Sequence, residues 1–146
     1  MNQLLRLSVV ALLALAADRT HPAVAQQQKQ VKTGAQEGGG GDAERGRYIV
    51  EHLAMCWRCH TPGGDRGEPD RAHWLQGAPI RSPEPDFAVY APRLAGRPPG
   101  TDEEVVNLLV TGIARTGKPP RPPMPIFKMS RKDAESILAY LKSLGK

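Results

Sequence analysis

Two cysteines and a histidine lie close together in the run Cys56-Trp57-Arg58-Cys59-His60. This C-x-x-C-H spacing is typical of covalent attachment of c-type haem. The two thiols lie three positions apart on one face of a helical turn, so both can add to the vinyl groups of one porphyrin. The histidine follows beneath the ring and can give an imidazole nitrogen to the iron. Cys56 and Cys59 are the only cysteines of the chain. The run therefore predicts one covalently bound haem c with iron.

Other chemistries use a pair of cysteines at this spacing. A thioredoxin-like dithiol needs an alternating strand–helix framework, and the adjacent histidine would then be accidental. A structural zinc site needs four ligands, and His52 and His73 would have to complete it, neither at finger-like spacing. A simple disulfide would explain none of the neighbouring sequence. We favour haem attachment, with thiol redox chemistry and zinc binding as alternatives.

A second stretch with chemical content is the proline-rich run 119–125, in which Met124 lies between prolines. Prolines fix φ and remove backbone donors, so this loop is stiff and can hold a thioether at a fixed place. Methionine and histidine are a known pair of axial ligands for c-type haem. We predict that His60 and Met124 are the metal ligands. The alternative is a methionine that only packs.

Four other side chains are rival ligands. His52 and Met55 precede the C-x-x-C-H run and should not reach the far face of the ring. His73 follows His60 closely, in a loop that could turn under or over the ring. Met129 lies just before a predicted helix start and is better placed to pack as a hydrophobic staple.

Three helices are predicted to position these residues. The first runs over 42–55, with Asp42 as its N-cap and Gly46 permitting a close helix crossing. The second begins with a capping box over 101–104 and ends near Gly112. The third follows a Ser130 N-cap, with apolar residues at helical spacing through Leu144. No stretch alternates as a strand, so we predict an all-α domain. The loop 61–100 would wrap the cofactor, with Trp74 and Tyr90 as candidates to contact it.

The chain divides into three parts. Residues 1–25 have a basic start, a short apolar run and an A-x-A site at 23–25, which predicts a secretory signal peptide and export to the periplasm. Residues 26–41 are rich in Gln and Gly and predict a disordered linker. Residues 42–146 are predicted to form one small domain. Once the signal is removed, no stable membrane span is expected. The alternatives are an uncleaved membrane anchor and a buried core helix.

These features together resemble the class I monohaem cytochromes c over 42–146. The resemblance implies a fold in which the first helix, with Gly46 and Tyr48, crosses the C-terminal helix, with Tyr140. It also implies that a loop methionine, Met124 here, closes the far face of the haem. The proline whose carbonyl accepts the ring N–H of the haem histidine would be Pro79.

The chain is most similar to cytochrome c subunits and domains that serve periplasmic dehydrogenases. The residues that carry this likeness are short motifs at 77–80, 101–104, 111–113 and 123–125. Such relatives often carry several haems and a membrane anchor, whereas this chain has one C-x-x-C-H run. The resemblance implies a protein redox partner, which would be a periplasmic dehydrogenase, a terminal oxidase or another cytochrome.

A haem with both axial positions filled by protein has no open site for substrate. We therefore predict a non-enzymatic carrier of single electrons. A haem enzyme or gas-binding sensor with a displaceable sixth ligand is the alternative. The net charge of +5 is consistent with an acidic redox partner and equally with an ordinary solvated surface. Nucleic acid is not an expected partner, because the chain is exported and has no recognition motif.

Overall fold

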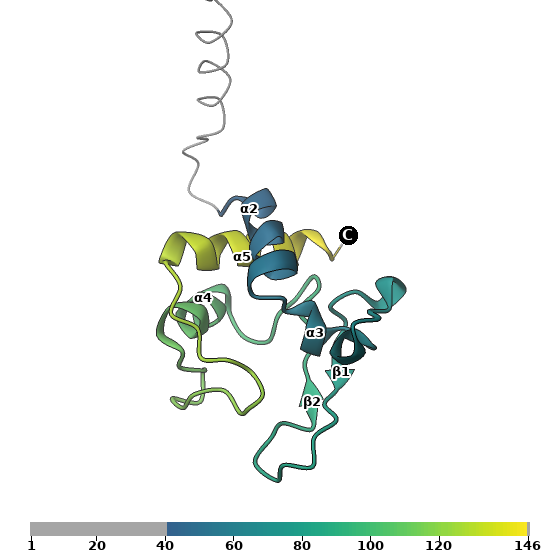
Figure 1. Ribbon diagram of the computed structural model, residues 1–146. Helices are drawn as coiled ribbons and strands as arrows, with labels where there is room; N and C mark the ends of the chain where they lie inside the picture. Colours follow the sequence, from purple (N-terminus) through teal and green to yellow (C-terminus); the bar gives the residue numbers. More distant parts are fainter. Residues whose placement is uncertain (1–40, 146) are drawn as a thin grey trace, which may run out of the picture. The chain divides into compact units, whose positions relative to one another are not determined.

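The computed structural model describes residues 41–145, whose path is shown in Figure 1. The predicted signal peptide at 1–25 and residues 26–40 of the predicted linker lie outside the described residues. The rest of the chain is mostly helical with long loops, which confirms the predicted fold class. Its elements are α2 (Ala43–Tyr48), η1 (Ile49–Leu53), α3 (Trp57–His60), η2 (Gly64–Arg66), η3 (Arg71–His73), β1 (Ala78–Pro79), β2 (Tyr90–Ala91), α4 (Asp102–Thr111) and α5 (Arg131–Ser143).

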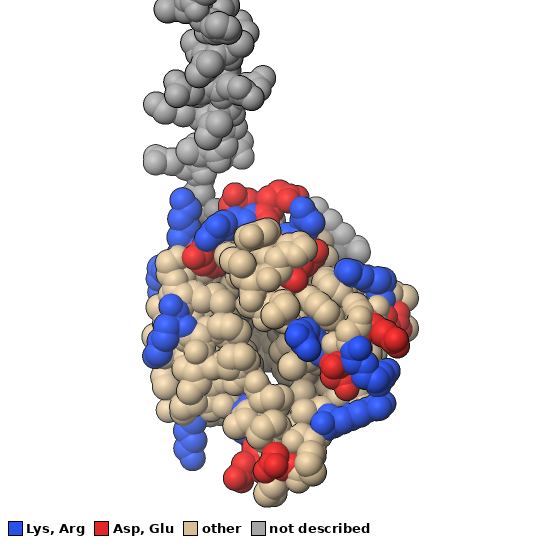
Figure 2. Space-filling view, in the orientation of Figure 1, with Lys and Arg blue, Asp and Glu red and all other residues tan. Residues whose placement is uncertain are grey.

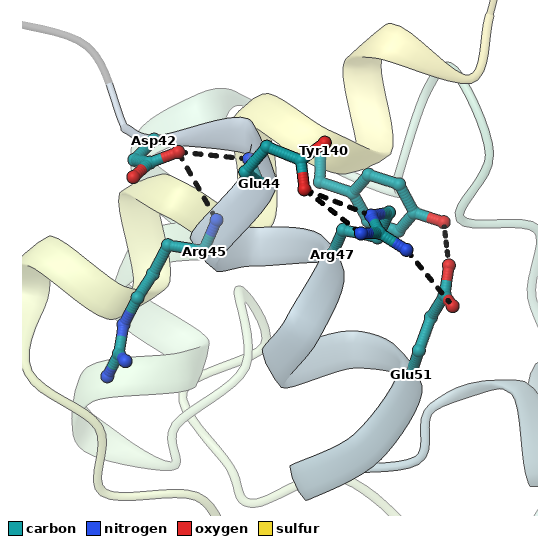
Figure 3. Close-up of polar contacts among 6 residues, drawn as sticks. All are labelled: Asp42, Glu44, Arg45, Arg47, Glu51 and Tyr140. Atoms are coloured by element: carbon teal, nitrogen blue, oxygen red, sulfur yellow. Dashed lines mark hydrogen bonds and ion pairs between the residues drawn. The ribbon is translucent and has the colours of Figure 1, made fainter. Parts of the chain in front are cut away.

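The first predicted helix is present as one helical path that changes type. Asp42 caps α2, and its carboxylate accepts the backbone N–H groups of Glu44 and Arg45 (Figure 3). From Ile49 the path continues as a single π-type turn, η1, in which the N–H of Ala54 bonds the carbonyl of Ile49 at 2.8 Å. A π-type turn holds one more residue than an α-helical turn. It leads directly into the C-x-x-C-H run.

Helices α2 and α5 cross in direct contact at Gly46 (Figure 1). A Cβ on Gly46 would lie 1.9 Å from the backbone oxygen of Ser136, so the crossing depends on a residue without a side chain. Near the crossing, the Tyr140 hydroxyl donates to Glu51 at 2.7 Å, and Arg47 pairs with Glu44 at 3.0 Å (Figure 3). This confirms the predicted close helix crossing.

The two later helices begin as their sequences predict. Thr101 and Glu104 form the reciprocal capping box of α4, and Gly112 ends that helix in the left-handed region at φ 72°. Ser130 caps α5 by accepting the N–H of Asp133. Arg131 of α5 donates to both carboxylate oxygens of Glu103, at 2.6 and 3.1 Å, and so ties α5 to α4.

The core is built mainly from η1, α4 and α5, which place their apolar faces together. Leu75 of the long loop joins them, with its N–H on the hydroxyl of Thr61 at 2.9 Å. The buried apolar residues of this cluster are Ile49, Val50, Leu75, Ala95, Val105, Val106, Leu109, Ala134, Ile137, Leu138, Tyr140 and Leu141.

The loop between α3 and α4 contains the one departure from an all-helical reading of residues 41–145. Residues 78–79 and 90–91 form a short antiparallel pair, β1 with β2, in which Ala78 faces Ala91 and Pro79 faces Tyr90. Each strand has two residues, which is too short to show an alternating pattern in the sequence. Across the described part of the chain, none of the helices combines the length and apolarity needed to cross a bilayer.

Candidate haem-binding site

An apolar cavity of about 470 Å³ opens between α3 and α4, where the face shown in Figure 2 is hollowed. Its size falls in the range of roughly 300–1,000 Å³ that is usual for ligand and cofactor sites. Residues from each of the three predicted helices and from both long loops line it. The apolar side chains in the lining include Ala54, Leu94, Val105, Leu108, Leu109, Phe127, Ile137 and Leu141.

Cys56, Cys59 and His60 all line this cavity. Cys56 is the N-cap of the short helix α3, and one helical turn places Cys59 and His60 after it. The N–H of His60 bonds the carbonyl of Cys56 at 3.0 Å, which fixes the spacing of the run. Both cysteines are half-buried, and neither forms a disulfide. The three residues of the predicted attachment run therefore line the same apolar cavity.

The imidazole of His60 is held in one orientation. Its Nδ1 lies 2.7 Å from the carbonyl oxygen of Pro92. Because a carbonyl can only accept, Nδ1 carries the proton and donates, and this leaves Nε2 with its lone pair for a metal. The residue is buried, with 7% of its surface exposed. Burial lowers the pKa of the ring, which favours the neutral, ligating form.

The proline assignment made from the resemblance is wrong. Pro79 lies in β1, opposite Tyr90, and does not line the cavity. Its segment contacts the backbone of His60, through the N–H of Gly77 on the His60 carbonyl at 2.9 Å. The ring N–H is accepted by Pro92, which follows β2 along the chain.

The segment that follows Pro92 is held against the site by contacts that the fold creates. Leu94 and Gly96 follow it at alternate positions, and Leu94 lines the cavity. The N–H groups of Leu94 and Ala95 bond the carbonyl of Leu75. Gly96 has a φ of 77° and passes so close to the end of α5 that a Cβ would lie 2.7 Å from Gly145. These contacts depend on how the long loop folds back, so the sequence alone does not single out Pro92.

Met124 also lines the cavity. Its proline-rich loop is tied to the segment 85–88 by Arg121, whose side chain donates to the carbonyl of Phe87 at 2.9 Å and to that of Asp86 at 3.2 Å. The N–H of Ala88 bonds the carbonyl of Pro122 at 2.7 Å. These bonds give the loop a fixed path past the cavity.

The rival ligands are placed differently. Met129 packs against the helical core and is absent from the cavity lining. His73 pairs with Asp70 at 2.6 Å, and the ring of His52 lies 5.5 Å from that of Tyr48. Met55 does line the cavity, but it lies directly before Cys56.

The two aromatic candidates of the long loop have different surroundings. Tyr90 lines the cavity. Trp74 does not. It stacks on Trp57 with ring centres 6.2 Å apart, and its indole N–H donates to the Tyr140 hydroxyl at 3.3 Å. Trp74 therefore supports α3 from outside the cavity.

The surroundings of the two cysteines do not suit thiol redox chemistry or a structural zinc site. Burial raises the pKa of Cys56 to about 11 and also raises that of Cys59. A thiol-redox centre needs the opposite shift, because the thiolate is its reactive form. Within residues 41–145, no group of three or more His, Cys, Asp or Glu side chains is gathered as a metal cluster. The donor set fits a haem instead, with two thiols, an oriented imidazole and a thioether around an apolar space.

Comparison with known proteins decides the family. A family model named Cytochrome c matches residues 43–145, which is most of the chain. The chain belongs to the cytochrome c family. This cytochrome c accordingly carries covalently bound haem c, which the pattern of Cys56, Cys59 and His60 fits, and it is an electron-transfer haem protein.

Two curated relatives are similar to parts of this cytochrome c. The fructose dehydrogenase cytochrome subunit of Gluconobacter japonicus is 31% identical over 108 residues, which are 70% of this chain and 22% of the relative. A protein described as diheme cytochrome c-type, from Cereibacter sphaeroides, is 50% identical over 38 residues, or 26% of this chain and 13% of the relative. The aligned regions thus cover less than a quarter of either relative.

Proposed function

We propose that this cytochrome c carries single electrons between protein partners through one haem whose iron is held by His60 and Met124. The observation that carries the proposal is that the imidazole, the thioether and both cysteines line the same apolar cavity. The bound haem supplies an iron that cycles between two oxidation states. The chain supplies the attachment, the orientation of His60 by Pro92, and a mainly apolar lining.

Two protein ligands on one iron leave no open position for a substrate. The function that remains is a change of oxidation state, which is electron transfer. A soft thioether also favours the reduced iron and raises its potential. The loop bonds made by Arg121 support this role, since they hold the methionine in place against competing small ligands.

Carbon monoxide binding to the reduced protein tests the ligand set. The purified protein should retain the mass of one haem after denaturation, and its reduced spectrum should not change quickly when carbon monoxide is added. Met124→Ala should bind carbon monoxide rapidly and have a lower midpoint potential. Met129→Ala is the matched control, because Met129 packs on the core outside the cavity and its loss should cost mainly stability.

Other results of this experiment would assign a different iron ligand or a different function. If Met129→Ala opens the iron and Met124→Ala does not, Met129 is the ligand. If neither variant changes the spectrum, His73 becomes the next candidate. Rapid carbon monoxide binding by the unaltered protein would replace the carrier with a gas-binding sensor or haem enzyme.

We also propose that residues 1–25 direct export and that the protein works in the periplasm with a dehydrogenase or another cytochrome as partner. The apolar run and the A-x-A site support export. The 31% identity to a fructose dehydrogenase cytochrome subunit supports a dehydrogenase partner. Fractionation of the native host should release the haem protein with the periplasm, beginning after Ala25. Recovery in the cytoplasm with Met1 intact would refute this proposal.

A further inference from the structure

Three segments of the chain meet at the imidazole of His60, and hydrogen bonds join them in a closed circuit. The first is 60–61, where α3 ends, the second is the turn at Leu75, and the third is 92–95, which follows β2. One link of the circuit is the bond between the imidazole and the carbonyl of Pro92, at 2.7 Å. Thr61, directly after His60, begins the other path between the first segment and the third.

This second path runs through the backbone of Leu75. The hydroxyl of Thr61 accepts the N–H of Leu75 at 2.9 Å. The carbonyl of Leu75 in turn accepts the N–H groups of Leu94 at 2.9 Å and Ala95 at 3.0 Å. Because Leu94 comes two positions after Pro92, these bonds fix the segment whose carbonyl meets the imidazole. The hydroxyl of Thr61 is the one side-chain group in this path, and the other donors and acceptors belong to the backbone.

The path is buried, and one of its residues is strained. Thr61 and Ala95 each expose 1% of their surface and Leu75 exposes 0%. A buried N–H that loses its acceptor has no water to replace it, so the Thr61 hydroxyl cannot be removed without cost. Leu75 also has a φ of 55°, in the left-handed region that leucine rarely adopts. Strained backbone of this kind persists only where the surrounding structure holds it.

The position of the Pro92 carbonyl affects how strongly His60 donates to iron. A hydrogen bond from Nδ1 to a carbonyl fixes the orientation of the imidazole and raises the basicity of its other nitrogen. A more basic imidazole stabilises the oxidised iron and so lowers the midpoint potential. A displaced Pro92 would therefore change the potential without changing the ligand.

We propose that Thr61 is a positioning residue for the haem ligand His60, and that it acts through Leu75 to hold the Pro92 carbonyl on the imidazole. This inference rests on the proposed electron-carrier function and names a residue that tunes its potential. Thr61 does not line the haem cavity. Its effect on the iron is therefore exerted through the hydrogen bonds of the circuit.

Thr61→Val tests the circuit, because valine keeps the branched shape of threonine and removes the hydroxyl. Two quantities are measured on the haem-loaded protein: the midpoint potential, and the hydrogen exchange rate of the His60 ring N–H, followed by NMR in the reduced state. Thr61→Val should raise the midpoint potential and speed this exchange roughly five- to tenfold, as expected for the loss of about one hydrogen bond. Thr61→Ser keeps the hydroxyl and should retain both values of the unaltered protein.

Thr111→Val is the matched control. The Thr111 hydroxyl also accepts a backbone N–H, that of Ile113 at 3.1 Å, but it lies outside the circuit and outside the haem cavity. Thr111→Val should lose stability and leave the potential and the ring N–H exchange unchanged. If Thr61→Val gave the same result, Thr61 would have only a structural role and the proposal would be overturned. A shift in Thr61→Ser as large as that in Thr61→Val would also overturn it, because the methyl group would then be responsible.

A further measurement needs no variant to fold. In native-state hydrogen exchange of the unaltered protein, the His60 ring N–H and the backbone N–H groups of Leu75 and Leu94 should open together, with the same dependence on guanidinium concentration. A Leu75 N–H that exchanged through a separate and easier opening than the His60 ring N–H would contradict the circuit. An unaltered protein without reversible one-electron reduction would instead refute the electron-carrier function, whatever the exchange rates. The two failures are therefore distinguishable.

Discussion

Replacing Gly46 by alanine tests the helix crossing on which the haem site is built. The added Cβ would lie 1.9 Å from the oxygen and 2.4 Å from the carbonyl carbon of Ser136. An ordinary contact needs 3.4 Å or more, so α2 and α5 would have to separate by roughly 1 to 1.5 Å, and a close-packed interior cannot refill such a gap. The atoms that are struck belong to the backbone and cannot rotate away.

The free energy of unfolding should fall by about 3 kcal/mol or more, at the upper end of what overpacking costs. Alanine's higher helix propensity returns only about 1 kcal/mol. The loss is large against the roughly 5–15 kcal/mol that stabilises a typical domain. Separating α2 from α5 would also disturb the adjoining contact between η1 and α5, where the side chains of Val50 and Ile137 are almost fully buried.

Guanidinium unfolding of the haem-loaded protein, followed by circular dichroism, gives the measurement. Gly117→Ala is the control, because Gly117 has a φ of 76° and a Cβ added there would meet no atom within 4 Å. That variant should lose only the roughly 1–2 kcal/mol of left-handed strain. If Gly46→Ala proved as stable as Gly117→Ala, the crossing would not be as close as described.

Three further predictions concern the cofactor, a helix cap and acid. Changing both Cys56 and Cys59 to alanine should leave a largely unfolded chain by circular dichroism, because the core then lacks the group that fills its 470 Å³ cavity. Thr101→Ala should lower the free energy of unfolding by about 1 kcal/mol in urea titrations, because it removes the capping box of α4. Arg45 holds the pKa of Asp133 below its ordinary value. The resulting stability is complete above the ordinary pKa and is lost as the pH falls through the lowered one, so Asp133→Asn should flatten the acid limb of the unfolding curve.

Each of these predictions has a contrary result. A cooperative melt of the cysteine-free chain without haem would mean that side chains close the cavity themselves. The control for the cap is Thr116→Ala, in an exposed turn. If Thr101→Ala and Thr116→Ala had the same free energy of unfolding, the capping box would not stabilise α4. If the acid limb of Asp133→Asn were unchanged, the loss of stability in acid would be assigned to Asp70 and Glu103 instead, whose pKa values are also lowered by their partners.

Much of the fold was predictable because its signals are local. The caps at Asp42, Thr101 and Ser130 need only neighbouring residues, and each is present as predicted. Gly46 was predictable for a related reason, since a glycine inside a helix usually marks a close approach.

The proline of the haem site was not predictable in the same way. The bond from His60 to Pro92 spans 32 positions and depends on how the long loop returns through β1 and β2. A likeness between short motifs placed it at Pro79, on the other strand of that pair. The sequence offers several prolines in the long loop, and the pairing of β1 with β2 determines which of them reaches the ring of His60. The ligand role of Met124 stays a prediction until the iron spectrum is measured.

The π-type turn at Ile49–Leu53 has a consequence for how the domain can vary. Gly46 fixes the angular position of α2 against α5, and the cavity that Cys56 and Cys59 line fixes theirs. Successive residues of an α-helix are about 100° apart around its axis, so an uninterrupted helix would tie these two positions to each other. The extra residue of η1 lets the angular position of the cysteines differ from the one that a continuous α-helix from α2 would impose. Removing one residue there would rotate the attachment cysteines by about a quarter-turn while leaving α2 seated on α5.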